Sequence, residues 1–251
     1  MSGHSKWATI KRKKGKADAE RGRVFTQHIK EITIASREGG GDPDGNPRLR
    51  TAIAAAKAAN MPNDNIKRAI LKGTGQLPGV TYESVTYEGY GPGGVALYME
   101  IMTDNKNRIV SEVRHILSKY GGKLGANGCV AWMFDSQGII TVDLDTTDEE
   151  TVMEVALEAG ADDIKTDSGA YEIIVNPNSL DDVRVALEGK NIPMVSAEVT
   201  MVPQNTVKLE SEKEASSMLK MMDLLEENDD IQKVYANFDI DDAILEKLAQ
   251  E

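Results

Sequence analysis

Residues 137–202 read "QGIITVDLDTTDEETVMEVALEAGADDIKTDSGAYEIIVNPNSLDDVRVALEGKNIPMVSAEVTMV", and this stretch decides the fold. β-rich runs of six to eight residues predict four strands, and these runs are "GIITVDL", "DDIKTD", "YEIIVN" and "SAEVTMVP". Helical spacing of apolar residues predicts one helix around Val152 to Ala159 and a second from Leu180 to Leu187. The resulting order β-α-β-β-α-β is the signature of a ferredoxin-like domain.

The segments on both sides of this stretch predict a second α/β domain. "TYESVTYEGY" and "GGVALYMEIMT" predict a hairpin, Ile109 to Leu117 a helix, and "CVAWMF" (129–134) a further strand. After Pro203, "NTVKLE", a helix near Ser216 to Glu227 and "IQKVYANF" supply a strand, a helix and a strand. We therefore expect 79–136 plus 203–251 to form one domain, with 137–202 inserted into it. Three domains in sequence are the alternative topology.

Residues 1–78 predict a small all-helical bundle behind a flexible basic arm. The residues show three apolar stripes at helical spacing. The first ends at the glycines at 39–41, and "DPDGNPRLR" (42–50) follows, where Asn46 can cap the second helix and Pro47 suits its first turn. Pro62 opens the third helix and Gly73 closes it. The predicted fold class is thus α+β and multidomain, with a helical bundle followed by two ferredoxin-like α/β domains.

The charge is divided unevenly along the chain. Its net charge is −12, yet residues 1–72 hold 16 Lys and Arg against 7 Asp and Glu, a sum of +9. Such asymmetry is typical of a basic nucleic-acid-binding module joined to acidic domains. Residues 137–202 carry 15 acidic and 3 basic groups. We expect this acidic part to orient the molecule by repelling phosphate, or to bind a basic protein partner; solubility alone is the alternative.

The candidate nucleic-acid-binding residues are cations outside the predicted apolar stripes, together with one aromatic residue. They are Lys6, Trp7, Lys11, Arg12, Lys13, Lys14, Lys16, Arg21, Arg23, Arg48, Arg50, Lys57, Lys67, Arg68 and Lys72. Cations neutralise phosphates and release counterions, and an aromatic ring can stack on a base. Trp7 would either stack in this way or dock the arm onto the helical bundle.

Several motifs come close to known sites and fail. "GYGPGG" (89–94) matches G-x-G-x-x-G, but a β-rich run follows it where a dinucleotide site needs a helix, so it predicts a hairpin turn. "DPDGNP" begins like a calcium loop, but Pro47 replaces the turn glycine and Ile53 the bidentate glutamate. The sequence holds no P-loop, no G-x-S-x-G and no Cys/His spacing suited to zinc. We therefore expect no cofactor, no metal, no catalytic residues and no enzymatic activity.

The sequence also indicates a compartment. No apolar run approaches the roughly 18–20 residues that span a bilayer, and no apolar segment follows the basic N-terminus as in a secretory signal. The single cysteine, Cys129, fits a reducing compartment. We expect a cytoplasmic protein that does not bind membranes; a mitochondrial transit peptide is the alternative interpretation of the basic N-terminus.

Four stretches resemble the YebC/PmpR family: "GHSKWATIKRKKGKADAERGRVFT", "GGGDPDGNPRLRTAIAAAKAANMP", "EGYGPGGVALYMEIMTDNKNRIVSEVRH" and "GGKLGANGCVAWMF". The resemblance runs from residue 2 through the C-terminal strand and is strongest before Phe134. It implies an all-helical N-terminal domain, two α/β domains and a non-enzymatic factor in gene expression. Members are usually described as probable transcriptional regulators, and mitochondrial relatives as translational activators of cytochrome oxidase.

Two functions follow from the charge and the resemblance. The first is a DNA-binding transcriptional regulator, although no recognition helix of a helix-turn-helix stands out. The alternative is a ribosome-associated translation factor that binds ribosomal or transfer RNA and eases translation of difficult, proline-rich stretches. Phosphate contacts carry no direct sequence information, so the basic residues alone leave DNA and RNA both open as partners.

Overall fold

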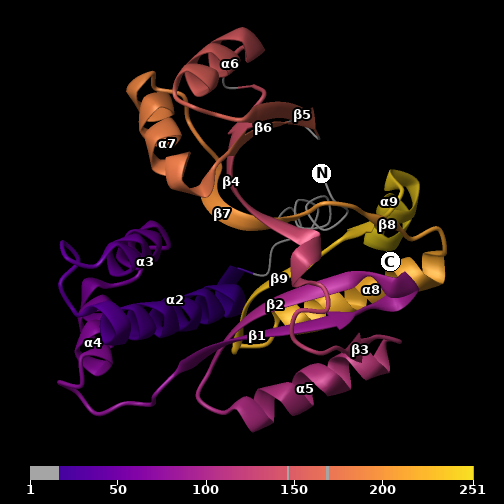
Figure 1. Cartoon of the computed structure of the whole chain (residues 1–251), viewed down its shortest axis with the longest axis horizontal. Coiled ribbons are helices and arrows are strands. Elements are labelled where there is room, and N and C mark those ends of the chain that lie inside the picture. Colours follow the sequence, from indigo (N-terminus) through magenta and orange to yellow (C-terminus); the bar gives the residue numbers. More distant parts are fainter. Residues whose placement is uncertain (1–16, 146, 168–169, 251) are drawn as a thin grey trace. The chain divides into compact units, whose positions relative to one another are not determined.

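The computed structural model describes residues 17–145, 147–167 and 170–250. Within these ranges the chain forms two compact units (Figure 1). The smaller unit spans 132–206, and the larger one combines 17–131 with 207–250. The boundary predicted after residue 78 falls inside the larger unit and, with the rest of the proposed division into domains, stays a prediction.

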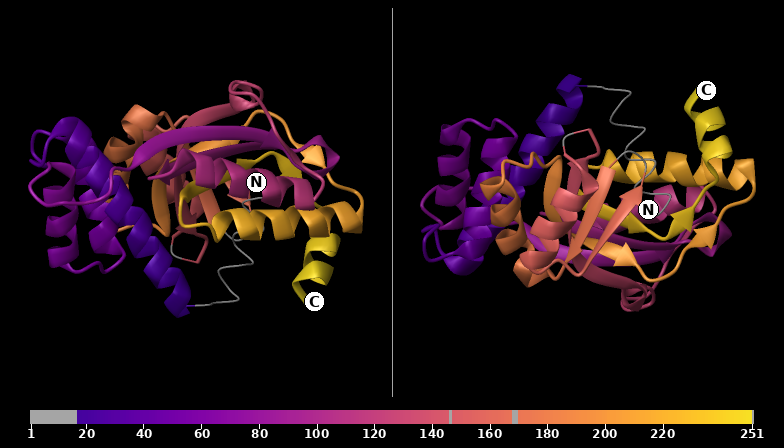
Figure 2. Two further views of the ribbon diagram at one scale, coloured as in Figure 1. Left: turned by 90° about the horizontal axis from the view of Figure 1, so that it is seen from below. Right: turned by 90° about the horizontal axis from the view of Figure 1, so that it is seen from above.

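Three helices make up the first part of the larger unit: α2 (Ala17–Gly39), α3 (Pro47–Ala58) and α4 (Asn63–Gly73). They pack side by side, as Figures 1 and 2 both show. Ile32, Leu49, Ala56 and Ile66 lie in their shared core, which is small because most of the contacting residues are alanine or short aliphatic side chains. The predicted helical bundle is confirmed for the described residues.

Asn46 begins α3 as predicted. Its Oδ1 accepts the Leu49 N–H at 3.1 Å, and Pro47 occupies the first helical position. Its Nδ2 also donates to the carbonyls of Ala35 and Gly40, both at 2.8 Å. One buried side chain therefore joins the end of α2 to the start of α3.

A four-stranded antiparallel sheet with the order β3-β1-β2-β9 forms the rest of the larger unit. Its strands are β1 (Glu83–Tyr90), β2 (Ala96–Thr103), β3 (Lys123–Leu124) and β9 (Ile231–Ala236). α5 (Lys106–Lys119) and α8 (Glu212–Glu226) contribute to one apolar core with alternate residues of β2, namely Leu97, Met99 and Ile101. β9 lies beside β2, so the C-terminal segment completes a sheet that the middle of the chain begins.

The glycine-rich segment between β1 and β2 is a hairpin turn, as predicted. η1 (Pro92–Gly94) connects the strands, and Tyr90 pairs with Ala96 at the end of the ladder. Gly93 and Gly94 have φ of 68° and 80°, in the left-handed region that favours glycine. The remaining elements of this unit are the parallel pair β8 (Val207–Lys208) and β10 (Phe238–Asp239) and the helix α9 (Asp242–Gln250).

The smaller unit has the predicted ferredoxin-like order of elements. These are β4 (Phe134–Asp143), α6 (Glu149–Glu158), β5 (Asp163–Asp167), β6 (Ala170–Val175), η3 (Pro177–Ser179), α7 (Leu180–Gly189) and β7 (Ser196–Pro203). The antiparallel sheet has the order β5-β6-β4-β7. Ile140, Ile173, Val152 and Leu187 lie in a core between this sheet and its two helices.

The prediction of a strand at "CVAWMF" (129–134) is wrong for the first five of these residues. Residues 125–130 form a loop, η2 (Ala131–Met133) follows, and β4 begins only at Phe134. The cause is Glu88 on β1, whose carboxylate accepts the backbone N–H groups of Gly128, Val130 and Ala131 at 2.5, 2.7 and 2.8 Å. These donors are therefore not available to a strand ladder.

None of the described helices is long and apolar enough to cross a membrane.

Candidate nucleic-acid interface

The residues predicted to bind nucleic acid fall into three groups. Lys6, Trp7, Lys11, Arg12, Lys13, Lys14 and Lys16 lie outside the residues that the structure describes. Arg21 lies on α2, but its side chain is not described. Arg23 is half-buried on the same helix. The remaining six cations lie on α3 and α4.

All six cations of α3 and α4 are exposed. Arg50 and Lys57 are seven residues apart, so they share one face of α3. Arg68 and Lys72 are four residues apart and share the face of α4 that points away from the buried Ile66 and Ala69. The cations of both helices thus lie outside their common core.

Arg48 differs from the other five because two carboxylates of α2 neutralise it at the surface. Its guanidinium donates to Glu31 at 2.8 Å and to Glu38 at 2.6 Å, both on α2. The hydrogen bond to Glu31, followed by the charges of both carboxylates, raises the pKa of Arg48. Arg48 therefore joins α3 to α2, and we do not count it among the cations available to phosphate.

Four of the six cations on α3 and α4 remain available to phosphate. Lys57, Lys67, Arg68 and Lys72 form no ion pair with any residue in the described ranges. Arg50 is an intermediate case, because its guanidinium donates to the Pro43 carbonyl at 3.3 Å but meets no carboxylate. Unpaired exposed cations can bind phosphate without first breaking an ion pair, which favours α4 and the end of α3 as the binding face.

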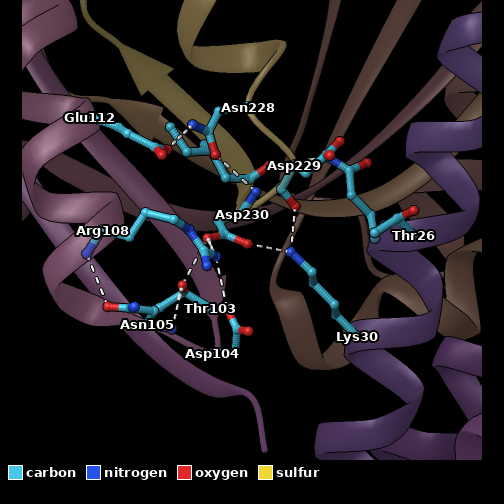
Figure 3. Close-up of polar contacts among 12 residues, drawn as sticks. Thr26, Lys30, Thr103, Asp104, Asn105, Arg108, Glu112, Asn228, Asp229 and Asp230 are labelled. Carbon is cyan, nitrogen blue, oxygen red and sulfur yellow. Dashed lines mark hydrogen bonds and ion pairs between the residues drawn. The ribbon is translucent and has the colours of Figure 1, made fainter. Parts of the chain in front are cut away.

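An ionic network that no sequence pattern indicated attaches α2 to the four-stranded sheet (Figure 3). Buried Lys30 on α2 reaches Asp230, just before β9, with 2.5 Å between Nζ and Oδ1, and donates to the Asp229 carbonyl at 2.7 Å. Thr103 and Arg108 donate to the other oxygen of Asp230 at 2.8 and 2.6 Å. Burial alone would raise the pKa of Asp230, but the hydrogen bonds from Lys30, Arg108 and Thr103 outweigh it and lower the pKa.

This network has a structural role. A buried carboxylate with three donors stabilises one arrangement of its elements, and removal of one partner from such a pair costs about 3–5 kcal/mol. Lys30 and Arg108 are thereby committed to Asp230, and Arg108 also to Asp104 at 2.7 Å. The network supports the helices that carry the available cations. Lys30 and Asp230 are 200 residues apart, so no local pattern could have paired them.

Among the described residues, no group of three or more His, Cys, Asp or Glu side chains could hold a metal ion.

Comparison with known proteins agrees with this architecture. The family model described as the TACO1/YebC protein N-terminal domain matches residues 5–76, and that of the TACO1/YebC second and third domain matches residues 82–238. A "probable transcriptional regulatory protein" of Syntrophus aciditrophicus is 60% identical over 250 residues, 99% of this chain and 100% of that one. A protein of the same description from Geobacter sulfurreducens is 59% identical over 248 residues, again 99% and 100% of the two chains.

A solved structure is also similar. The crystal structure of a conserved hypothetical protein from Aquifex aeolicus superimposes with a TM-score of 0.80 at 47% identity, covering 90% of this chain and 93% of that one. The two family models together span the helical bundle and both four-stranded sheets. The chain belongs to the TACO1/YebC family.

Proposed function

We propose that this protein is a nucleic-acid-binding regulator of gene expression that acts on transcription and catalyses no reaction. The observation that carries the proposal is the set of unpaired cations Lys57, Lys67, Arg68 and Lys72 on a segment with a net charge of +9 over residues 1–72. Its relatives in Syntrophus aciditrophicus and Geobacter sulfurreducens are named probable transcriptional regulatory proteins, which favours transcription over the translational alternative.

The binding mode follows from charge and rigidity. Helices α3 and α4 present their cations on a preorganised scaffold, and the basic arm of residues 2–16 adds further positive charge. Phosphate contacts of this kind position a protein on nucleic acid without reading its sequence. The acidic residues 137–202 would repel phosphate, so that the basic end engages first; they would also suit a basic protein partner. A role in transcription fits the cytoplasm, the compartment that the sequence predicts.

Neutralisation of the α4 cations tests the binding face. The variant Lys67→Gln, Arg68→Gln, Lys72→Gln should bind duplex DNA more weakly, and the slope of log K against log salt should flatten by about 2–3, since each lost phosphate contact contributes about 0.9. The melting temperature should hardly change, because the three side chains are exposed. Fluorescence anisotropy over a range of salt concentrations measures both affinity and slope.

The matched control removes three exposed cations elsewhere: Lys190→Gln, Lys213→Gln, Lys220→Gln. It changes the net charge equally and should leave the salt slope as in the wild type. Equal effects of the two variants would show that only overall charge matters and that α4 is not the binding face.

Crosslinking in cells, with sequencing of the DNA and the RNA recovered together, tests the target. Enrichment of promoter DNA is the expected result. Strong enrichment of ribosomal or transfer RNA without promoter peaks would overturn the transcriptional role and support translation instead.

A further inference from the structure

The longest stretch of the chain without an acidic residue runs from residue 113 to residue 134. It covers the second half of α5, the strand β3 and the segment up to the first residue of β4. Its three Lys and Arg residues are Arg114, Lys119 and Lys123, whereas residues 73–251 as a whole carry 13 Lys and Arg against 34 Asp and Glu. Positive charge is therefore concentrated a second time, outside the basic N-terminal segment.

The exposed side of α5 carries side chains that suit phosphate. Every exposed residue of this helix is basic or neutral, because its one acidic residue, Glu112, is partly buried and accepts a hydrogen bond from Asn228 at 2.8 Å. Four exposed residues recur at intervals of three or four positions and form one stripe, namely Asn107, Ser111, Arg114 and Ser118. Arg, Ser and Asn side chains all donate to phosphate oxygens in complexes with nucleic acid.

The three cations of this region are not neutralised. Arg114, Lys119 and Lys123 are exposed and form no ion pair with any residue of the described ranges. Arg108, at the start of the same helix, is by contrast committed to Asp230. Cations without a carboxylate partner can bind phosphate and release its counterions without first breaking an ion pair.

Aromatic rings hold the two lysines near the end of α5. Lys119 Nζ lies 5.3 Å from the ring centroid of Tyr120, and Lys123 Nζ lies 5.7 Å from that of Tyr90. Such a contact attracts an ammonium group but does not neutralise its charge. Tyr90 and Lys123 face each other across the pairing of β1 with β3, the edge strand beside α5 (Figure 1). Helix and sheet therefore fix both positive charges on a rigid scaffold.

We propose that the exposed side of α5, together with Lys123 on β3, is a second phosphate-binding surface. It contacts the same molecule of nucleic acid that α3 and α4 bind, and both surfaces belong to the larger unit. The inference rests on the proposed function, because nucleic acid is the ligand. The stripe from Asn107 to Ser118 is about 16 Å long, a length over which duplex DNA carries roughly ten phosphate charges. Its donors can therefore follow a phosphate backbone.

The test measures salt-dependent binding by the full-length protein. The ligands are a labelled DNA duplex of about 24 base pairs and a labelled single-stranded RNA of about 24 nucleotides. The variant Arg114→Gln, Lys119→Gln, Lys123→Gln should bind the duplex roughly 10- to 500-fold more weakly at about 0.1 M salt, the loss that one to three contacts produce. The slope of log K against log salt should flatten by about 1–3 for the duplex and about 0.7–2 for the single strand. An effect in one arm alone identifies the nucleic acid concerned.

Two further variants are the controls. Lys165→Gln, Lys190→Gln, Lys208→Gln removes three exposed lysines outside α5 and β3, so it changes the net charge equally and should bind as the wild type. Arg114→Lys, Lys119→Arg, Lys123→Arg keeps the charge of the surface and should largely restore binding. The melting temperature of all three variants should stay close to that of the wild type, because the replaced side chains are exposed.

Combination with the α4 variant tests whether one molecule of nucleic acid contacts both surfaces. The protein with all six substitutions, three on α4 and three on α5 and β3, should lose the sum of the two changes in salt slope, as separate contacts do. A slope no flatter than that of either triple variant would show that only one surface binds at a time, and would overturn the inference.

The failure of this inference differs from the failure of the proposed function. If the α5 variant binds both nucleic acids as tightly as the wild type while the α4 variant binds weakly, the inference is overturned and the proposed function stands; the surface then suits an acidic protein partner. If the α5 variant loses affinity but crosslinking in cells recovers ribosomal or transfer RNA without promoter DNA, the second surface stands and the transcriptional role fails.

Discussion

Glu88 shows how one side chain can decide local structure. It is 5% exposed on β1, and its carboxylate binds three backbone N–H groups of the loop that precedes β4. Burial alone would raise its pKa, but these three hydrogen bonds outweigh burial and lower the pKa. The folded protein therefore holds Glu88 as a carboxylate. Lys30 and Asp230 act in the same way on a larger scale, since one buried ion pair attaches a helix to a sheet.

Glu88→Gln should destabilise the protein by about 2–3 kcal/mol at pH 7, because an amide offers one acceptor oxygen to donors that the carboxylate satisfies with two. The folded-state pKa lies below the unfolded value of about 4.3, so the carboxylate stabilises the fold above that pH. This contribution is lost as the pH falls through the folded-state pKa. The difference between wild type and variant should therefore shrink below about pH 4, as measured by urea unfolding at several pH values.

Glu83→Gln on the same strand is the control for this prediction. Glu83 is exposed, and among the described residues its ion pair is with the exposed Lys106, so its replacement should change stability little. A difference for Glu88→Gln that is equally large at pH 7 and pH 3 would contradict the role of its charge.

At the scale of elements, the connection between α2 and α3 depends on Asn46. A typical N-cap satisfies one backbone N–H, but Asn46 also donates to two carbonyls at the end of α2. The close packing explains the glycine at position 39, where a Cβ atom would lie 2.7 Å from Asn46 Nδ2. This connection places α3, with Lys57, relative to α2.

Asn46→Ala should cost about 2–3 kcal/mol, the sum of a lost cap and of two carbonyls, one buried and one partly buried, that lose their donor. Asn105→Ala is the comparison, because Asn105 caps α5 in the same way through the Arg108 N–H at 3.0 Å but is exposed. It should cost about 1 kcal/mol. Denaturant unfolding of both variants measures the difference, and equal losses would show that the two extra hydrogen bonds of Asn46 contribute nothing.

At the scale of the whole molecule, charge and folding units coincide. The acidic residues 137–202 fall in the unit 132–206, and the available cations of α3 and α4 fall in the other unit. Phe134 and Pro203 face each other across the pairing of β4 with β7, so the chain enters and leaves the smaller unit at neighbouring points. Its core contains residues of its own sheet and helices.

A fragment of residues 132–206 should therefore fold by itself and unfold cooperatively on heating, as followed by circular dichroism. It should not bind DNA or RNA, because its excess of carboxylates repels phosphate. The complementary protein, with residues 131 and 207 joined by a short Gly-Ser linker, should keep the binding of the full chain. A fragment that melts without a transition, or that binds nucleic acid as well as the full chain, would contradict this assignment.

The sequence by itself determined the elements and the distribution of charge. Strand and helix periods predicted all six main elements of the ferredoxin-like unit, and Asn46, Pro47 and the glycines at 93 and 94 predicted a cap and a turn. These features depend on residues a few positions apart, so local chemistry suffices to specify them.

Only the tertiary structure decided which residues are free to contact a ligand and which are already bound by residues far away in the chain. The sequence predicts that Arg48 is exposed and basic, and the structure shows it exposed, yet Glu31 and Glu38 on another helix neutralise it. "CVAWMF" is apolar enough for a strand, yet Glu88, more than 35 residues earlier, binds its backbone as a loop. Glu100 and Gln232 lie on neighbouring strands because β9 pairs with β2, although more than 130 residues separate them in the sequence. Each outcome depends on contacts between residues far apart in the chain, and hydrophobic periodicity contains no information about such contacts.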